Sequence, residues 1–383
     1  GITSMLYKDH GIGRAFISYA DYFGECTEDS ADGSDNSLED SSCMISKNCA
    51  VDLDALSYLY LANRLIHLIS PDAITIAEDV SGYPGLAAGK SFVDSEKGVY
   101  RVGFDYRFAM GIPDLWIKIL KECKDEDWQL GQLWYELNAR RDDENTISYA
   151  ECHDQALVGD KTLMMHLMGE QIYSAMSINY ETIKTFRAVA LHKMIRFITF
   201  ATAGAGYLNF MGNEFGHPEW IDFPGAHNNW SYHFARRQWS LRDNKNLYFY
   251  MLAQFDRDML SLSKQYNFIG PTKGELLHIH ETNKVISFQR KFSYDKDSGY
   301  DNLIFIFNFN PDVSFNDYLI DAPAGKYKEI MNSDELKYGG KGRLTGGQEH
   351  FTHHTYDAAS GSRNRLSLYI PTRTASVLVK IDG

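Results

Sequence analysis

Ala73-Ile-Thr-Ile-Ala-Glu-Asp-Val-Ser-Gly82 is a short apolar, β-branched run that ends in two acids and a turn. Such a run, closed by Ser81-Gly82, is typical of a buried strand. Glu78 then stands at the carboxyl end of that strand, where α/β barrels place their catalytic groups. The alternative is that Glu78-Asp79 is only a polar pair that ends a strand and has no catalytic role. A second acidic segment, Tyr149-Ala-Glu-Cys-His-Asp-Gln155, favours the catalytic interpretation.

Strand-like and helical patterns alternate around this stretch, which indicates βαβ units and a parallel sheet. Leucines at helical spacing predict a helix over 52–68, and Ser70-Pro71 ends it. Each predicted strand closes in or near a polar, acid-bearing loop, as in a barrel with its site on one rim. We therefore predict an α/β fold, with half of a (β/α)8 TIM barrel over residues 1–265. The further strands are predicted at 100–106, 146–150 and 206–210, and the further helices at 113–121, 128–137, 183–202 and 246–262.

Residues 266–383 have a different character, because helical periods give way to segments rich in Ile, Phe, Tyr and Val with Asn, Asp and Gly between them. This pattern predicts an all-β domain, a small antiparallel sandwich. Its strands are predicted at 275–281, 284–292, 302–310, 318–321, 326–331 and 365–381.

Composition limits the possible partners of the chain. The 383 residues are 44% hydrophobic and 14% aromatic, and the formal net charge is -13. That charge argues against nucleic acid and against an anionic membrane surface. The acidic, serine-rich segment at about residues 25–50 cannot bury enough apolar surface to order itself, so we expect a solvated insertion.

Five cysteines at irregular spacing, with no CxxC pair, predict a reduced, cytoplasmic protein without a disulfide framework or zinc site. No apolar run is long enough to span a bilayer, and no signal peptide is visible. The first residues resemble the inside of a domain, so we expect the chain to be a fragment.

Two carboxylates at neighbouring strand ends can flank a glycosidic bond, one as a proton donor and the other as an anion. Glu78 is the candidate acid, because desolvation at the end of an apolar strand raises a carboxyl pKa. Asp154 is the candidate anion, with His153 beside it to bond sugar hydroxyls; the alternative is a helix N-cap pair. Cys152 is interpreted as a small buried filler. Asp105 is either a nucleophile or a structural partner of Arg107.

The chain resembles the eukaryotic type of 1,4-α-glucan branching enzymes of the α-amylase superfamily. The matching segments include Thr75-Ile-Ala-Glu-Asp-Val-Ser-Gly82, Val102-Gly-Phe-Asp-Tyr-Arg107, the segment 149–161 and the segment 207–224. The likeness covers nearly the whole chain, through Tyr369-Ile-Pro-Thr-Arg-Thr-Ala375. The run 213–224 is typical of branching enzymes within the superfamily.

The resemblance implies that Glu78 is the general acid/base, Asp154 the transition-state stabiliser, and His153 a substrate-binding residue. Asn213 and Glu214 are further expected substrate contacts. The family breaks an α-1,4 bond of a glucan such as glycogen, amylose or amylopectin and passes the chain to a 6-hydroxyl, without metal or organic cofactor.

The resemblance also places the family's nucleophilic Asp immediately before Gly1, so an N-terminal half of the enzyme is expected to be missing and this chain to be inactive alone. Two alternatives stay open: a glucan hydrolase of the same superfamily, and a non-catalytic glucan-binding module.

Overall fold

The structure is a computed structural model that describes residues 1–12, 51–89, 92–94, 99–157, 161–270, 272–292, 301–357 and 361–381. The chain forms two compact units, which are described separately. The first comprises Gly1–Met110, Arg140–Ile147 and Gly204–Gly206; the second comprises Gly111–Ala139, Ser148–Ala203 and Tyr207–Gly383. The acidic segment at 25–50 lies outside the described residues. Within those residues, no helix combines the length and apolar character needed to cross a membrane.

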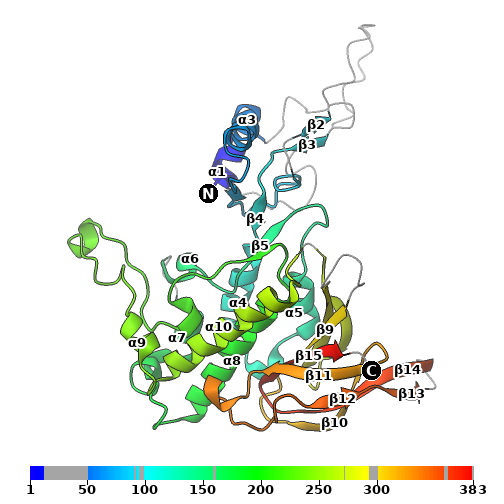
Figure 1. Cartoon of the computed structure of the whole chain (residues 1–383). Coiled ribbons are helices and arrows are strands. Elements are labelled where there is room, and N and C mark those ends of the chain that lie inside the picture. The colour runs from blue at the N-terminus through cyan, green and yellow to red at the C-terminus, as the bar shows by residue number, and fades with distance from the viewer. Residues whose placement is uncertain are drawn as a thin grey trace. The chain divides into compact units, whose positions relative to one another are not determined.

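The first unit contains two helices, α1 (Thr3–Leu6) and α3 (Leu53–Ile69) (Figure 1). Asp52 caps α3 by accepting hydrogen bonds from the backbone of the first turn. The helix ends at Ser70, before Pro71, so the predicted helix is confirmed. Its apolar residues divide between two faces: Leu56 and Leu59 are buried in the unit's core.

The other apolar residues of this region are exposed and form what we call the aliphatic face. Its members are Leu61, Leu65, Leu68 and Ile69 of α3 and Ile74 and Ile76 around the first strand, with exposed fractions between 41% and 78%. An exposed set of this kind on a folded domain marks a surface that packs against something else.

A four-stranded sheet has the order β1-β4-β5-β6, with β1 (Ile76–Ala77) at its edge. The other strands are β4 (Tyr106–Phe108), β5 (Thr146–Ser148) and β6 (Gly206–Tyr207). β1 pairs with β4, and β4 with β5, in parallel. The parallel sheet is therefore confirmed, although its strands are shorter than predicted.

The strand predicted at 100–106 is wrong as a single element. Residues Val99–Arg101 form β3, which pairs antiparallel with β2 (Phe92–Asp94), and the chain enters the parallel sheet only at β4. Gly103, at φ 92°, breaks the extended backbone between the two strands.

The second unit is built around α8 (Ile183–Ala201), a helix that is buried along most of its length. Its Phe197 makes edge contacts with Phe255 of α10 (Tyr248–Tyr266) and with Phe305 and Phe307 of β9 (Asp301–Asn308). The predicted helices at 113–121, 128–137, 183–202 and 246–262 are confirmed. The other helices are α4 (Gly111–Glu122), α5 (Leu130–Leu137), α6 (His153–Leu157), α7 (Leu163–Met168) and α9 (Trp239–Asp243), and the 3-10 turns are η1 (Asp125–Asp127), η2 (Gly169–Tyr173), η3 (Asn213–Phe215), η4 (Ala226–Asn228) and η5 (Leu336–Tyr338).

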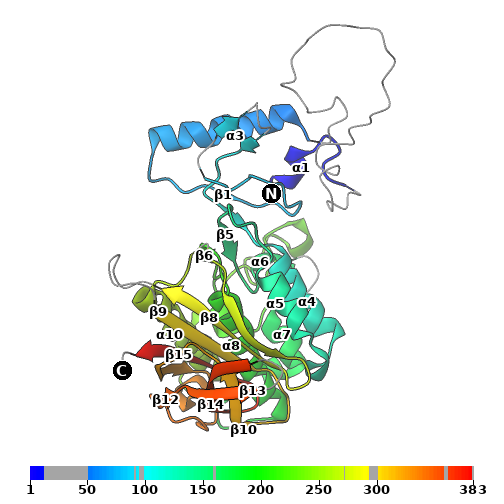
Figure 2. The same cartoon turned by 90° about the vertical axis from the view of Figure 1, so that its right-hand side faces the viewer.

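The carboxyl-terminal part of this unit is all-β and antiparallel, as predicted (Figure 2). A six-stranded sheet, β12-β11-β15-β9-β8-β7, faces a three-stranded sheet, β10-β14-β13, and Ile304, Ile306, Leu366 and Leu368 belong to their shared core. The strands are β7 (Glu275–His280), β8 (Val285–Phe292), β9 (Asp301–Asn308), β10 (Phe315–Asp321), β11 (Lys326–Asn332), β12 (Glu349–Phe351), β13 (His353–Asp357), β14 (Gly361–Ile370) and β15 (Thr374–Ile381).

The segment 365–381, predicted as one strand, divides between two strands of different sheets. The break falls between β14 and β15, where Pro371 lacks a backbone N–H and Arg373 has a positive φ of 49°.

Candidate active site

Glu78 follows β1 directly, in the first unit, and its side chain is 43% exposed. The burial expected from an apolar strand is not found, because Ile74 and Ile76 are themselves exposed. The backbone oxygen of Glu78 accepts a hydrogen bond of 2.9 Å from the amide of Ile2. One carboxylate oxygen of Glu78 lies 3.1 Å from the backbone nitrogen of Gly1. Residues 1 and 2 therefore run beside the predicted acid.

Asp79, the neighbour of Glu78, anchors the loop that carries it. The carboxylate is buried and accepts hydrogen bonds from the hydroxyl of Ser81 (2.7 Å) and the amide of Tyr83 (3.0 Å). It also pairs at 2.9 Å with Arg107, whose other guanidinium nitrogen pairs at 2.8 Å with buried Glu144. One arginine thus ties the ends of β1 and β4 to the segment before β5, which fixes where Glu78 stands.

The predicted pairing of Asp105 with Arg107 is wrong. Asp105 lies 2.9 Å from the ring nitrogen of His67 and accepts a 2.7 Å hydrogen bond from the amide of Thr75. Burial raises the pKa of Asp105, but the hydrogen bonds from Thr75 and His67 bring it below its ordinary value. Arg107 is occupied by the two buried acids named above. Whether Asp105 acts as a nucleophile stays a prediction.

In the second unit, His153 and Asp154 begin α6, just after β5. The Nε2 atom of His153 lies 3.1 Å from one oxygen of Asp154, and both side chains are more than a third exposed. The other oxygen of Asp154 accepts a 3.4 Å hydrogen bond from the thiol of buried Cys152. Burial, with the nearby Asp154 carboxylate, raises the pKa of Cys152 to about 12. Cys152 is thus a buried, free thiol, as predicted, and the carboxyl group of Asp154 lies between this thiol and the ring of His153.

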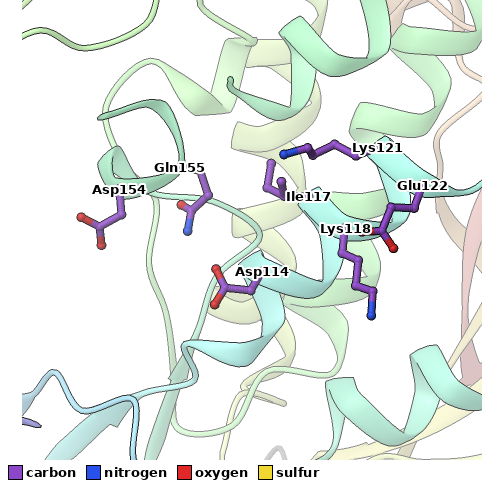
Figure 3. Close-up of a pocket in the computed structure, with 7 residues that line it drawn as sticks. All are labelled: Asp114, Ile117, Lys118, Lys121, Glu122, Asp154 and Gln155. Atoms are coloured by element: carbon purple, nitrogen blue, oxygen red, sulfur yellow. The ribbon is translucent and has the colours of Figure 1, made fainter. Parts of the chain in front are cut away.

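A cavity of about 510 Å³ adjoins this pair and is lined by residues of α4 and α6. Figure 3 shows Asp114 and Gln155 turned toward one another, with Asp154 pointing away from them. Burial raises the pKa of Asp114, which is also near the charge of Asp154, although a hydrogen bond with Gln155 opposes that rise. The remaining lining residues are Ile117, Lys118, Lys121 and Glu122.

The loop after β6 brings the predicted contacts Asn213 and Glu214 to the second unit. Phe210, earlier in this loop, packs its ring 5.5 Å from that of His153. Asn213 is buried, and its amide nitrogen has no hydrogen-bond partner among the described residues. Glu214 folds back to accept a 2.6 Å hydrogen bond from the amide of Gly212, and burial raises its pKa. The loop therefore lies next to His153, with Glu214 engaged in its own backbone.

Glu151 is a buried residue to which the sequence alone assigned no role. One carboxylate oxygen accepts a 2.8 Å hydrogen bond from the amide of Leu163, and the other has no partner among the described residues. Burial raises the pKa of Glu151 to about 7, although Leu163 and the charges of Arg196 and Arg237 oppose that rise. Its position directly after an apolar strand was the available signal, but its charged neighbours are distant in sequence.

A buried polar cluster supports the strand ends near Glu151. Arg196 of α8 forms a short ion pair with Asp256 of α10 and donates a 3.0 Å hydrogen bond to Asn209. Asn209 in turn donates to Asp256 at 3.1 Å. The guanidinium of Arg196 also lies over the ring of Tyr207. The residues after β6 are thus fixed against the two long helices.

Among the described residues, Cys152, His153 and Asp154 are the only group of side chains with metal-ligand potential, their ligand atoms lying within 4.8 Å of one another. A thiol must lose its proton to bind a metal, and the raised pKa of Cys152 opposes this.

Residues 278–380 match the family model described as the α-amylase C-terminal all-β domain. The second unit therefore ends in a domain of α-amylase type, in agreement with its antiparallel sheets.

Over its whole length, the chain is similar to proteins named 1,4-α-glucan-branching enzyme. It is 44% identical to that of Emericella nidulans over 99% of this chain and 49% of the relative. It is 44% identical to that of Felis catus over 100% of this chain and 49% of the relative. The enzyme of Solanum tuberosum is 45% identical over 92% of this chain and 36% of the relative. The chain is thus homologous to the 1,4-α-glucan-branching enzymes, and it spans about half the length of the first two relatives.

Proposed function

We propose that this chain is part of a 1,4-α-glucan branching enzyme, a glycosyltransferase that breaks an α-1,4 bond and joins the released chain to a 6-hydroxyl. The observation that carries the proposal is the 44% identity to enzymes of that name along the whole chain. The His153–Asp154 pair supports it, because an anion beside a hydrogen-bonding ring suits a sugar that develops positive charge.

The proposed fold of the longer protein is a (β/α)8 barrel to which this chain contributes the second half. The parallel pairing of β1, β4 and β5 supports this, as does the position of β1 at a sheet edge. Parallel sheets are normally covered on both faces, and an open edge favours further pairing. The aliphatic face around α3 and β1 would pack against the preceding half. In this proposal the barrel half covers residues 1–265 and the β domain covers residues 266–383.

In the proposed mechanism, Glu78 donates a proton to the leaving glycosidic oxygen and later removes one from the acceptor 6-hydroxyl. The ionised Asp154 stabilises the oxocarbenium-like transition state, and His153 bonds sugar hydroxyls. Asn213 and Glu214 are proposed further substrate contacts. The anchoring of Asp79 by Arg107 gives Glu78 a fixed backbone, which acid catalysis needs.

The nucleophile of the longer protein is proposed to be the Asp that the family carries immediately before Gly1. The hydrogen bond from the Ile2 amide to the backbone oxygen of Glu78 supports this, because it holds the residues that follow this Asp beside the acid. Retaining enzymes hold their two carboxyl groups about 5–5.5 Å apart. Attack by this Asp would give a covalent glycosyl-enzyme, and no metal or organic cofactor is proposed for the chemistry.

The test compares this chain with a protein extended to the length of its relatives, using amylose as the substrate. We expect only the extended protein to shift the iodine absorbance without releasing reducing ends. Reducing ends that rise together with the loss of colour would identify a hydrolase. Retention of amylose by both proteins without any reaction would identify a binding module.

The role of Glu78 is tested in the same extended protein by Glu78→Gln, which keeps the side-chain shape and removes the acid. We expect loss of branching with unchanged folding. Glu170→Gln, an exposed site in the second unit, is the control and should keep normal activity. Substantial branching by Glu78→Gln would remove Glu78 from the acid/base role.

The proposed setting is a cytoplasmic glucan-synthesising enzyme whose partner is an α-1,4-glucan such as glycogen, amylose or amylopectin. The net charge of -13 supports a neutral polysaccharide rather than a nucleic acid or an anionic membrane.

A further inference from the structure

Residues 217–238, between η3 and α9, form what we call the aromatic loop, the green segment beside α9 at the left of Figure 1. Its exposed large apolar side chains are Trp220, Phe223, Trp230 and Tyr232, with exposed fractions of 38%, 51%, 69% and 74%. All of them are flat rings. The aliphatic face around α3, in contrast, exposes mainly leucine and isoleucine.

Hydrogen bonds close the base of the aromatic loop. The amide of Gln238 donates to Nε2 of His217 at 3.0 Å, and the side chain of Gln238 donates to Glu219 at 2.7 Å. Burial and the charge of Arg237 lower the pKa of His217 to about 4, so the ring is neutral and can accept at pH 7. The loop is therefore a braced structure at its base.

The middle of the loop is braced by a ring stack. Trp220 and Phe234 lie with centroids 4.2 Å apart and planes inclined by 24°. The ring of His233 meets the edge of Phe234 at 4.6 Å. The backbone amide of Asp222 donates to the oxygen of Phe234 at 3.4 Å. Trp220 stays partly accessible in this stack, with 38% of its surface exposed.

The tip of the loop holds Trp230 in an unfavourable backbone conformation. The Trp230 amide donates to the oxygen of Gly225 at 2.8 Å, and the side chain of Asn228 bonds both the Gly225 amide (3.0 Å) and Asp222 (2.8 Å). Trp230 has a φ of 58°, a region that bulky side chains rarely adopt. A glycine would fit there more easily, so the exposed indole is retained at a cost, which points to function.

The chemistry of the loop favours a carbohydrate ligand. Flat rings stack on the apolar faces of sugars, while the exposed polar residues Asn229, Ser231 and His233 between them can bond hydroxyls. The net charge of -13 disfavours a polyanion.

The aromatic loop is continuous with the proposed catalytic surface of the second unit. Arg237, at its end, donates to the oxygen of Met211 at 3.1 Å and places its guanidinium 5.8 Å from the ring of Phe210. Phe210 contacts the ring of His153. A glucan chain that reaches His153 could therefore extend onto the loop.

We propose that the aromatic loop is a glucan-binding subsite, in which Trp230 and Tyr232 stack on sugar rings of an α-1,4-linked chain. The inference rests on the proposed function for the identity of the glucan, and it adds a binding site beyond the residues proposed for the reaction.

The test measures binding of maltoheptaose by changes in tryptophan fluorescence, with a β-1,4-linked glucose oligomer as the comparison ligand. Trp230→Gly and Tyr232→Ala are prepared in the full 383-residue chain and in the extended protein. Tyr356→Ala is the matched control, because Tyr356 is an exposed tyrosine (80%) on β13 of the β domain. Because Trp230→Gly removes a tryptophan and so changes the fluorescence signal, isothermal titration calorimetry also measures the affinity of each variant for maltoheptaose.

We expect Trp230→Gly and Tyr232→Ala each to weaken maltoheptaose binding by about fivefold or more, and Tyr356→Ala to leave it unchanged. Trp230→Gly should unfold in urea at the same concentration as the original chain or a higher one, because glycine relieves the backbone strain. Weaker binding without lower stability would show that the indole serves the ligand.

Unchanged binding in both loop variants would overturn the proposal, as would equal binding of the β-1,4 oligomer or no binding of maltoheptaose by either parent protein. The iodine test of the proposed function reads chemistry, whereas this test reads binding. Failed branching with loop-dependent binding would reject the reaction and keep the subsite; normal branching with loop-independent binding would do the reverse.

Discussion

Replacement of Glu151 by Gln should stabilise the second unit at neutral pH and leave its stability unchanged in acid. Glu151 is buried, with one oxygen bonded to the amide of Leu163 and the other without a partner among the described residues. Gln can still accept the bond from Leu163, because it keeps an oxygen at the same reach. The substitution therefore removes a proton equilibrium and little else.

The magnitude follows from the pKa of Glu151, which is about 7 in the folded chain against an ordinary value of 4.5. Because the folded pKa is the higher, the folded chain binds more protons between these values and loses stability as the pH rises. The difference corresponds to about 3 kcal/mol, reached once the pH exceeds about 7. Below about pH 4.5 the acid is protonated in both states, and the two proteins should be equally stable.

Urea unfolding from pH 4 to pH 8, followed by the fluorescence of the buried Trp116 and Trp128, measures this difference within the second unit. We expect the advantage of Glu151→Gln to grow between about pH 4.5 and 7. The charges facing Glu151 are those of Arg196 and Arg237. A difference that is constant with pH would show that folding does not shift the pKa of Glu151, and an advantage of the original chain that grows with pH would show that the arginines stabilise its anion. Either result would refute the reasoning.

Three further predictions concern the other parts of the chain. Arg107→Met should lower the free energy of unfolding of the first unit by about 3–5 kcal/mol, because buried Asp79 and Glu144 lose the guanidinium that joins them. Arg141→Met removes only the exposed second partner of Glu144, at a side chain 43% exposed, and should cost less than about 1 kcal/mol. Urea unfolding compares the two variants, and equal effects would contradict the anchoring role of Arg107. Leu65→Lys, on the exposed side of α3, should change the free energy of unfolding of this chain by less than about 0.5 kcal/mol. The same substitution should destabilise the extended protein by about 2 kcal/mol or more. A small effect in both proteins would argue against packing on that face. Asp154→Asn in the extended protein should lower the turnover of branching by about 100-fold or more with intact folding, and near-normal turnover would remove Asp154 from the role of transition-state stabiliser.

The long helices and the β domain could be predicted from sequence because their patterns are local and strong. α8 and α10 follow from apolar residues at helical spacing, and the antiparallel strands from β-branched and aromatic runs. The short helices α6, α7 and α9 were not predicted, because a segment of five or six residues shows too little helical periodicity. The single strand predicted over 100–106 is wrong because the positive φ of Gly103 interrupts the extended backbone in its middle.

The candidate site was predictable in its residue types and less so in its supports. Glu78 follows β1 directly, as predicted, whereas His153 and Asp154 begin the short helix α6 and not a loop. The roles of these three residues stay predictions. The partners of Arg107 could not be recognised from the sequence, because three-dimensional packing selects them. Asp79 is 28 residues and Glu144 is 37 residues from Arg107. The charges that act on Glu151, those of Arg196 in α8 and Arg237 at the end of the aromatic loop, are likewise distant from it in sequence.

The aliphatic face has a colloidal consequence for the chain when it is handled alone. At neutral pH the net charge of -13 makes the molecules repel one another, which keeps the exposed leucines and isoleucines apart. Near the isoelectric point of about 5.4 that repulsion vanishes, and the same side chains become points of self-association. Mildly alkaline buffers of low ionic strength, in which the repulsion is least screened, therefore suit the isolated chain best.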